Sequence, residues 1–185
     1  IRPGEQHQIG QLEVEWFAVC HSVPDSTGIA INTPAGVVIH TGDFKLDNAP
    51  VIGPPSDLGL LADICQDGAL LLMADSTYAE EEGYSPSDRE VVENLPGLIG
   101  EAENRIIISS FASQIARIQI VADACIKHGR KLCVLGRSMI NNTKTGRELG
   151  HLDIPGDLMI TAAEANSLPS DKVLILTTGS QGEPQ

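Results

Sequence analysis

The chain has 185 residues, of which 42% are hydrophobic and 20% are charged, a composition typical of a folded globular protein and not of a disordered one. Its net charge of -13 at pH 7 argues against a nonspecific nucleic-acid coat protein, because an acidic surface repels phosphate at long range. A nucleic-acid enzyme stays open, since bound divalent cations and a local basic lining can reverse the field within a cleft.

No apolar run in the sequence approaches the roughly 18 to 20 residues of a membrane helix, and no basic-then-apolar leader opens it. The four cysteines form no C-x-x-C pair and have apolar neighbours (Cys20, Cys65, Cys125 and Cys133). This pattern predicts buried thiols in a reducing compartment, hence a cytoplasmic protein without a membrane partner. Because the chain starts at Ile1 and not at Met, we expect it to be a piece of a longer protein.

The first part of the chain predicts β-structure. Residues 11–20 begin with alternating polar and apolar side chains, the period of a half-buried strand. Residues 28–32 and 37–40 are short apolar runs separated by turn residues, which indicates a β-hairpin. After a loop rich in proline and glycine, residues 58–64 could form a short helix.

From about residue 68 the pattern changes to alternating strands and helices. The continuous apolar run 69–73 is typical of a strand covered on both faces. A helix is expected to start with Ser85 as its N-cap, Pro86 in its first turn and Asp88 as capping-box partner. Residues 96–97, Pro-Gly, should kink that helix or end it early.

Further strands are predicted at residues 105–108, 131–135 and 173–177, with a shorter one within 157–161. Helices are expected between them, one of which should stop at Gly129. Strands that alternate with helices in this way predict an α/β fold with a mostly parallel sheet and right-handed crossovers.

Four of the strand ends lead into loops of small, hydroxylated or glycine residues, namely 75–77, 109–113, 136–138 and 178–182. In a parallel sheet such loops share one edge, where backbone N–H groups and hydroxyls suit a phosphate. Arg117 and Arg137 are the candidate charge partners. The alternative is that each loop only caps its helix.

His21 and Asp43 each follow an apolar, strand-like run, and an imidazole and a carboxylate are metal-ligand types. A lone histidine is more often a satisfied core or surface residue, and Thr-Gly-Asp is also common turn composition. Two donors do not complete a catalytic metal site, which usually needs at least three from the protein.

Six motifs in order resemble ribonuclease J, a β-CASP member of the metallo-β-lactamase fold. They are His21-Ser-Val-Pro-Asp-Ser, Thr41-Gly-Asp-Phe-Lys, Asp75-Ser-Thr, Phe111-Ala-Ser, Gly136-Arg-Ser-Met and Thr178-Gly-Ser-Gln-Gly-Glu-Pro. The resemblance implies that residues 1–75 are part of the β-rich metallo-β-lactamase domain. It also implies that residues 76–185 are a β-CASP domain, incomplete at its C-terminus, with a Rossmann-like parallel sheet flanked by helices.

By this resemblance, His21 corresponds to a zinc ligand, and Asp43 to a catalytic aspartate that bridges two zinc ions. Asp75 corresponds to the acidic residue that opens the β-CASP motifs near the metals, and is expected to be catalytic. The Phe111-Ala-Ser loop corresponds to a segment near the RNA phosphates. The expected RNA- or phosphate-binding residues are Ser76, Thr77, Phe111, Ala112, Ser113, Arg137, Ser138, Gly179 and Ser180.

The sequence departs from the family pattern in two places: it lacks the His-x-His-x-Asp-His run and the later histidine motifs. We therefore expect this chain alone to be inactive or very weak. The resemblance implies an intact parent with two zinc ions per site that cleaves RNA as a 5′-to-3′ exonuclease and endonuclease in maturation and decay, and that assembles as a homo-oligomer.

Three alternatives stay open. The first is a noncatalytic RNA-binding or assembly subunit of the same fold. The second is a β-CASP nuclease that acts on DNA or processes RNA 3′ ends. The third is a generic α/β domain whose loops merely cap helices.

Overall fold

The computed structural model describes residues 1–84 and 86–179, and the chain divides into two compact units. Residues 1–87 form the N-terminal unit and residues 88–185 the C-terminal unit. The junction between the units therefore follows Ser87, twelve residues beyond the domain boundary expected at residue 75. The assignment of residues 1–75 and 76–185 to two domain families stays a prediction.

The N-terminal unit is built on a five-stranded sheet with its strands in chain order. The strands are β1 (Gln6–Ile9), β2 (Leu12–Ala18), β3 (Thr27–Thr33), β4 (Gly36–His40) and β5 (Leu71–Met73). Neighbours from β1 to β4 are antiparallel, and β5 is parallel to β4. The structure confirms the predicted hairpin of β3 and β4, whereas β1 was not anticipated.

One face of this sheet carries the core of the N-terminal unit. Phe17, Ala30 and Ile39 are buried there. Helix α1 (Leu58–Ile64), the short helix predicted from the sequence, packs against them through its apolar side chains. Its first turn is capped by Asp57, whose carboxylate accepts the Leu60 N–H at 2.9 Å.

Strand β5 contradicts one expectation, because it is not covered on both faces. Leu70, Leu71, Leu72 and Met73 are 46% to 60% exposed. The strand pairs only with β4 in the described chain and forms the last position of its sheet. Helix α1 packs over the side chains of the more central strands, so a continuous apolar run predicted the strand correctly and its burial wrongly.

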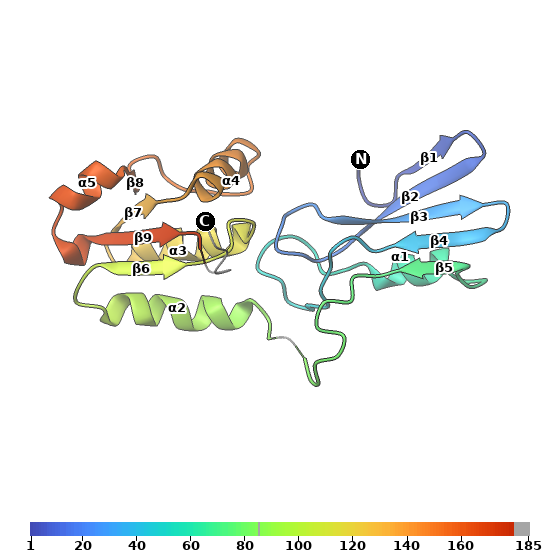
Figure 1. Ribbon diagram of the computed structural model, residues 1–185, viewed down its shortest axis with the longest axis horizontal. Coiled ribbons are helices and arrows are strands. Elements are labelled where there is room, and N and C mark those ends of the chain that lie inside the picture. Colours follow the sequence, from blue (N-terminus) through green and yellow to red (C-terminus); the bar gives the residue numbers. More distant parts are fainter. Residues whose placement is uncertain (85, 180–185) are drawn as a thin grey trace. The chain divides into compact units, whose positions relative to one another are not determined.

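The C-terminal unit contains a four-stranded sheet whose order is β6, β9, β7, β8. The strands are β6 (Ile106–Ser109), β7 (Lys131–Val134), β8 (Met159–Ile160) and β9 (Val173–Thr177). All described pairings in it are parallel, and Figure 1 shows β6, β9 and β7 pointing the same way. The predicted α/β fold with a parallel sheet flanked by helices is confirmed.

Both faces of this second sheet are covered near its centre. Leu132, Leu174 and Leu176 have no exposed surface. The opposite face packs Cys133 and Val173 against Ala165 of α5 (Ala162–Ser167). The other helices are α2 (Arg89–Glu101), α3 (Ile115–Lys127) and α4 (Arg137–Glu148).

The cysteines are free thiols, as predicted. Cys20, Cys125 and Cys133 are buried, and Cys65 is half-buried. Burial raises the pKa of Cys125 to about 12, although the nearby Arg130 lowers it. At neutral pH this thiol is therefore protonated and behaves as a small apolar side chain.

Helix α2 differs from the sequence expectation at both ends. It begins at Arg89 with Asp88 as N-cap, and the Asp88 side chain makes no capping hydrogen bond. The expected cap Ser85 lies outside the described residues. The helix also continues through Pro96 to Glu101, because the burial of Ile99 and packing against α3 compensate for the missing proline N–H.

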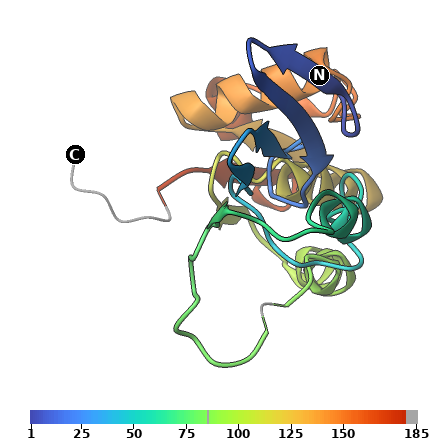
Figure 2. The same cartoon turned by 90° about the vertical axis from the view of Figure 1, so that its right-hand side faces the viewer.

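Figure 2 shows residues 76–84, between β5 and α2, extending as a wide loop. Every residue in this segment is exposed.

None of the helices in the described part of the chain is long and apolar enough to cross a membrane.

Candidate functional site

The structure brings His21 and Asp43 together at one end of the N-terminal sheet. His21 follows β2 and Asp43 follows β4. The His21 Nε2 atom lies 3.9 Å from the Asp43 Oδ2 atom, an ion-pair distance too long for a direct hydrogen bond. The Asp43 side chain is 82% exposed and that of His21 29%, so both polar groups remain accessible to a ligand.

A tight turn at Gly42 carries the chain from β4 to Asp43. Gly42 has a φ of 63°, the left-handed region that glycine adopts without strain. Its N–H donates to His40 Nδ1 at 2.9 Å. An added Cβ would lie 3.3 Å from the Thr27 carbonyl oxygen. Glycine at this position therefore lets the turn pack against β3 and turn Asp43 toward His21.

Hydrogen bonds tie the His21 segment to the Asp43 loop. The Lys45 N–H donates to the Cys20 carbonyl at 2.8 Å. The Cys20 N–H donates to Ser56 Oγ at 2.8 Å, and that hydroxyl donates to the Lys45 carbonyl at 3.3 Å. Cys20 precedes His21, and Lys45 lies two residues after Asp43, so these bonds hold the two donors in register.

Asp75 joins the same end of the sheet through the parallel strand β5. Its N–H donates to Thr41 Oγ1 at 3.1 Å. Its Oδ1 accepts the Thr77 hydroxyl at 2.7 Å and the Thr77 N–H at 2.9 Å. These two bonds lower the pKa of Asp75 below its usual 3.8, with smaller contributions from the Phe44 N–H and the charge of His21. The carboxyl group is therefore ionised at neutral pH and lies beside the Asp43 loop.

Ser76 and Thr77 were both expected to contact phosphate, but Thr77 has another partner. Its hydroxyl and its N–H both donate hydrogen bonds to Asp75 Oδ1. The Ser76 carbonyl accepts the Ala79 N–H at 3.0 Å, while its side chain is exposed. This loop thus orients the Asp75 carboxylate, and Ser76 is the residue that could meet an external phosphate.

The donor types here fit zinc, whereas their number falls short. Zinc sites use imidazole nitrogen and carboxylate oxygen, and need at least three protein ligands. Across residues 1–84 and 86–179, no group of three or more histidine, cysteine, aspartate or glutamate side chains could hold a metal ion. His21 and Asp43 are thus two donors of an incomplete set, and no reaction step follows from them alone.

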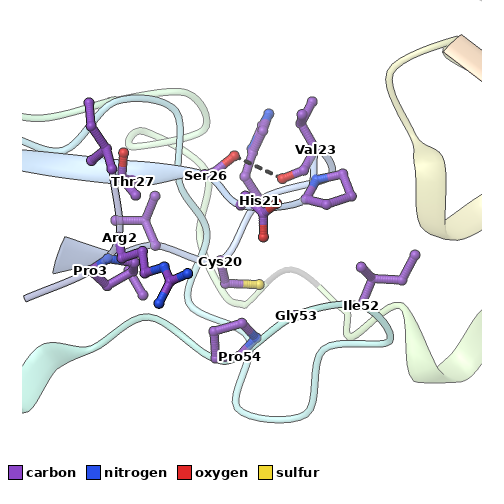
Figure 3. A pocket seen from close by; sticks show the side chains of 15 residues that line it. Arg2, Pro3, Cys20, His21, Val23, Ser26, Thr27, Ile52, Gly53 and Pro54 are labelled. Carbon is purple, nitrogen blue, oxygen red and sulfur yellow. Dashed lines mark hydrogen bonds between the residues drawn. The ribbon is translucent and has the colours of Figure 1, made fainter. Parts of the chain in front are cut away.

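A cavity of about 380 Å³ opens beside His21 and is lined mainly by apolar side chains and prolines. Figure 3 shows Cys20, Ile52 and Pro54 around it, together with the bond from the Ser26 hydroxyl to the Val23 carbonyl that closes the turn after His21. Arg2 and His21 are basic side chains in its lining. This lining is poorly suited to a phosphodiester, so the polar groups outside it are the better candidates.

The four hydroxyl-rich loops do not share one sheet edge, which corrects the sequence expectation. The loop 75–77 follows β5 in the N-terminal sheet, while the other three follow β6, β7 and β9 in the C-terminal sheet. Strand runs that look alike in sequence do not reveal which sheet each strand joins. The predicted phosphate-facing edge is thereby reduced to three loops.

Two of these three loops lie against each other. Gly136 has a φ of 92°, and an added Cβ would lie 2.8 Å from Thr178 Oγ1. Gly136 is the N-cap of α4, and neither α3 nor α4 has a side-chain capping bond. In α3 the N–H groups of Ile115 and Arg117 already donate to the Ser113 and Gln114 carbonyls. The first turn of α4 is therefore the better place for an anion on this edge.

The expected phosphate ligands of the C-terminal unit lie around this edge. Phe111, Ser113, Arg137, Ser138 and Gly179 are exposed. The Ala112 carbonyl accepts the Asn142 side chain at 2.8 Å, which ties the first loop to α4. Ser180 lies outside the described residues.

The structure gives Arg117 a partner other than phosphate. Its Nη2 lies 3.3 Å from Asp88 Oδ1, so it forms an ion pair within the C-terminal unit. Arg137 is exposed at the start of α4. It remains the basic candidate on this edge.

Sequence reasoning missed the residues that hold the site in place. Thr41 is buried, and its hydroxyl accepts a hydrogen bond from the Asp75 N–H. Ser56 forms hydrogen bonds with both Cys20 and Lys45. Asp47, four residues after Asp43, is also buried. A charged residue so close to a candidate ligand was a signal that could have been noticed, whereas Ser56 stands in a loop with no distinguishing pattern.

Comparison with known proteins shows which proteins this chain is similar to. Residues 103–185 match the model described as the beta-CASP domain of ribonuclease J. A ribonuclease J from Thermus thermophilus is 44% identical over all 185 residues. Over its whole length the chain is similar to ribonuclease J. The six ordered motifs all lie within this matched length.

Other members of the ribonuclease J family match as well. The protein from Mycolicibacterium smegmatis is 44% identical over 183 residues, and that from Synechocystis is 42% identical over 185. The chain covers 32% of the Thermus and Mycolicibacterium proteins and 29% of the Synechocystis one. It thus spans about a third of the length of these relatives.

A solved structure supports the fold. The crystal structure of a protein of unknown function from Enterococcus faecalis superposes with a TM-score of 0.62, covering 95% of this chain and 44% of that one. Its sequence is only 18% identical. The likeness therefore concerns the fold alone.

Proposed function

We propose that this chain is part of a metal-dependent ribonuclease of the ribonuclease J type, which hydrolyses RNA phosphodiesters as a 5′-to-3′ exonuclease and endonuclease. The observation that carries the proposal is the approach of His21 and Asp43 to 3.9 Å, with the Asp75 carboxylate beside them. The whole-length match to proteins named ribonuclease J supports it.

In this proposal His21 and Asp43 supply two ligands to a zinc site, and the remaining ligands come from outside the chain. Bound metal ions of this kind generate hydroxide and stabilise the charge that develops on the phosphodiester. The chain by itself is then inactive or very weak. A homo-oligomeric parent with RNA as its substrate completes the proposal.

The chain's own residues position groups around that chemistry. Thr77 holds the Asp75 carboxylate in one orientation and keeps it ionised. Thr41 fixes the backbone of Asp75. The hydrogen bonds between Cys20, Ser56 and Lys45 keep the His21 and Asp43 segments together. A donor set fixed in this way needs little rearrangement when a metal binds.

The C-terminal unit supplies the groups that would receive RNA. Arg137 and Ser138 open α4, and the helix N-terminus adds backbone N–H donors. Phe111 is 41% exposed and presents a ring on which a base could stack. These side chains contact phosphate and base without a metal, so RNA binding and hydrolysis are assigned to separate residues.

The decisive experiment replaces Asp43 with Ala in a ribonuclease J polypeptide that contains this segment. Zinc-dependent RNA cleavage should fall by about three orders of magnitude, because metal ions contribute several kcal/mol and each 1.4 kcal/mol is a factor of ten. Single-turnover cleavage of 5′-labelled RNA measures the effect. Asp63→Ala is the matched control, since Asp63 is an exposed carboxylate on α1.

Two outcomes would contradict the proposal. Retained cleavage in the Asp43→Ala variant would remove Asp43 from the metal site. Absence of cleavage in the unsubstituted polypeptide, with RNA binding intact, would identify a noncatalytic RNA-binding subunit. Matched RNA and DNA strands in the same assay test whether the substrate is RNA.

A further inference from the structure

Neighbouring residues at the junction of the two units make side-chain bonds in different units. The Ser87 hydroxyl lies 2.9 Å from Asp47 Oδ1 and 3.0 Å from Oδ2, within the N-terminal unit. The Asp88 carboxylate is paired with Arg117 at 3.3 Å, within the C-terminal unit. One peptide bond therefore separates two anchors.

On the N-terminal side, the anchor is a buried carboxylate. The Asp47 side chain is 5% exposed, and its Oδ1 accepts the Ala49 N–H at 2.9 Å. The Lys45 Nζ atom lies 3.4 Å from its Oδ2. A buried charge is stable only with such partners, so the Ser87 hydroxyl is part of the set that fixes residues 45–49.

On the C-terminal side, the anchor is the start of a helix. The Asp88 carbonyl accepts the Val91 N–H at 3.0 Å, and its carboxylate is held by Arg117 of α3. Helix α2 begins at the next residue, Arg89. Both the main chain and the side chain of Asp88 are thus fixed in the C-terminal unit.

We propose that Asp47 and Ser87 are positioning residues that fasten the inter-unit junction to the loop carrying Asp43. With both anchors in place, the connection between the units shortens from the exposed segment after β5 to the Ser87–Asp88 peptide. A shorter connection gives a smaller range of separations. The statement about Asp43 rests on the proposed function, whereas the statement about the junction does not.

The chain itself allows a direct test. In Ser87→Ala, exchange of the Ala49 N–H should rise about five- to tenfold, the effect of one lost hydrogen bond of roughly 1 kcal/mol. The ¹⁵N relaxation times should also show the two units tumbling more independently. Ser87→Thr keeps a hydroxyl and should restore both values. Ser167→Ala removes a hydroxyl bonded to a backbone carbonyl in α5 and should change neither.

A second variant separates the two anchors. Arg117→Ala should increase the independent tumbling of the units. Exchange of the Ala49 N–H should stay unchanged, because this substitution leaves the hydrogen bond between Ser87 and Asp47 in place. Unchanged Ala49 exchange in Ser87→Ala, or a Thr variant that behaves like the Ala variant, would overturn the positioning role. Unchanged tumbling in both Ser87→Ala and Arg117→Ala would overturn the shortened junction.

The consequence for Asp43 is tested in the longer ribonuclease J polypeptide. Ser87→Ala should weaken cobalt binding, measured by absorption, about 10- to 100-fold, as losses of supporting groups around metal ligands do. Asp43→Ala should abolish it. If Asp43→Ala leaves cobalt binding unchanged, the proposed function fails, while the exchange and tumbling measurements still decide the junction.

Discussion

The two units differ most in charge and in how their sheets are covered. Residues 1–87 contain thirteen acidic and two basic residues, a net charge of -11. Residues 88–185 contain twelve acidic and ten basic residues, a net charge of -2. The acidity that argues against nucleic acid for the whole chain is therefore concentrated in the unit that carries His21, Asp43 and Asp75.

This difference suits a division of chemistry. A carboxylate-rich surface attracts divalent cations and repels phosphate, whereas a nearly neutral unit with basic residues tolerates a phosphate backbone. The proposed metal ligands in the N-terminal unit and the proposed RNA contacts of the C-terminal unit are compatible with that distribution. The sheets also differ in how far their strands are covered: β9 is a buried central strand, whereas β5 is an exposed strand at the end of its sheet.

The contrast in coverage gives the largest expected effect on stability. Leu174 in β9 is fully buried, so Leu174→Ala should cost about 2 to 5 kcal/mol of unfolding free energy. Leu72 in β5 is 59% exposed, and Leu72→Ala should change stability by no more than about 0.5 kcal/mol. Urea unfolding of the chain measures both. Equal losses would show that the two strands are covered alike.

The contrast in charge predicts where RNA binds. Arg137→Ala should reduce the slope of log affinity against log salt by about 0.7, the value for one single-strand phosphate contact. Fluorescence anisotropy with a single-stranded RNA at several salt concentrations measures the slope. Lys127→Ala is the control, because Lys127 lies in the last turn of α3, at the far end from the loop that starts it. An identical slope for both variants would remove Arg137 from the RNA surface.

The smallest expected effect concerns one carboxyl group in each unit. Threonine partners lower the pKa of Asp75 in the N-terminal unit and of Glu164 in the C-terminal unit. When folding lowers the pKa of a carboxyl group, the folded state gains stability at pH values above the usual pKa of that group. This stability is lost as the pH falls through the lowered pKa of the folded state. Thr77→Val should raise the pKa of Asp75 toward 3.8. NMR titration of the carboxyl groups measures the pKa of Asp75, with the unchanged pKa of Glu164 as an internal reference.

Local patterns were sufficient for most of the elements. Period-two alternation marked β2, and short apolar runs between turn residues marked β3 and β4. Gly129, with a φ of 63°, follows the C-cap of α3 as expected. Pro96 was expected to kink α2 or to end it early. The early end was wrong, because packing on α3 outweighed one lost hydrogen bond, and the kink stays a prediction.

The candidate site was predictable only in part. His21 and Asp43 stand out in sequence as ligand-type residues after strands, and the structure places them 3.9 Å apart. Their metal role stays a prediction. The partition of four similar loops between two sheets could not be read from the sequence, because strand pairing depends on contacts between distant segments.

The sequence by itself determined most of the elements, the resemblance to ribonuclease J and the identity of the two candidate donors, since these depend on local spacing and residue type. Only the tertiary structure decided that Asp75 lies beside the Asp43 loop, that Arg117 is held by Asp88, and that Ser87 completes the partners of a buried Asp47. Each of these is a contact between residues 29 to 40 positions apart. Such contacts form only when strands and helices pack, which is why no local pattern reveals them.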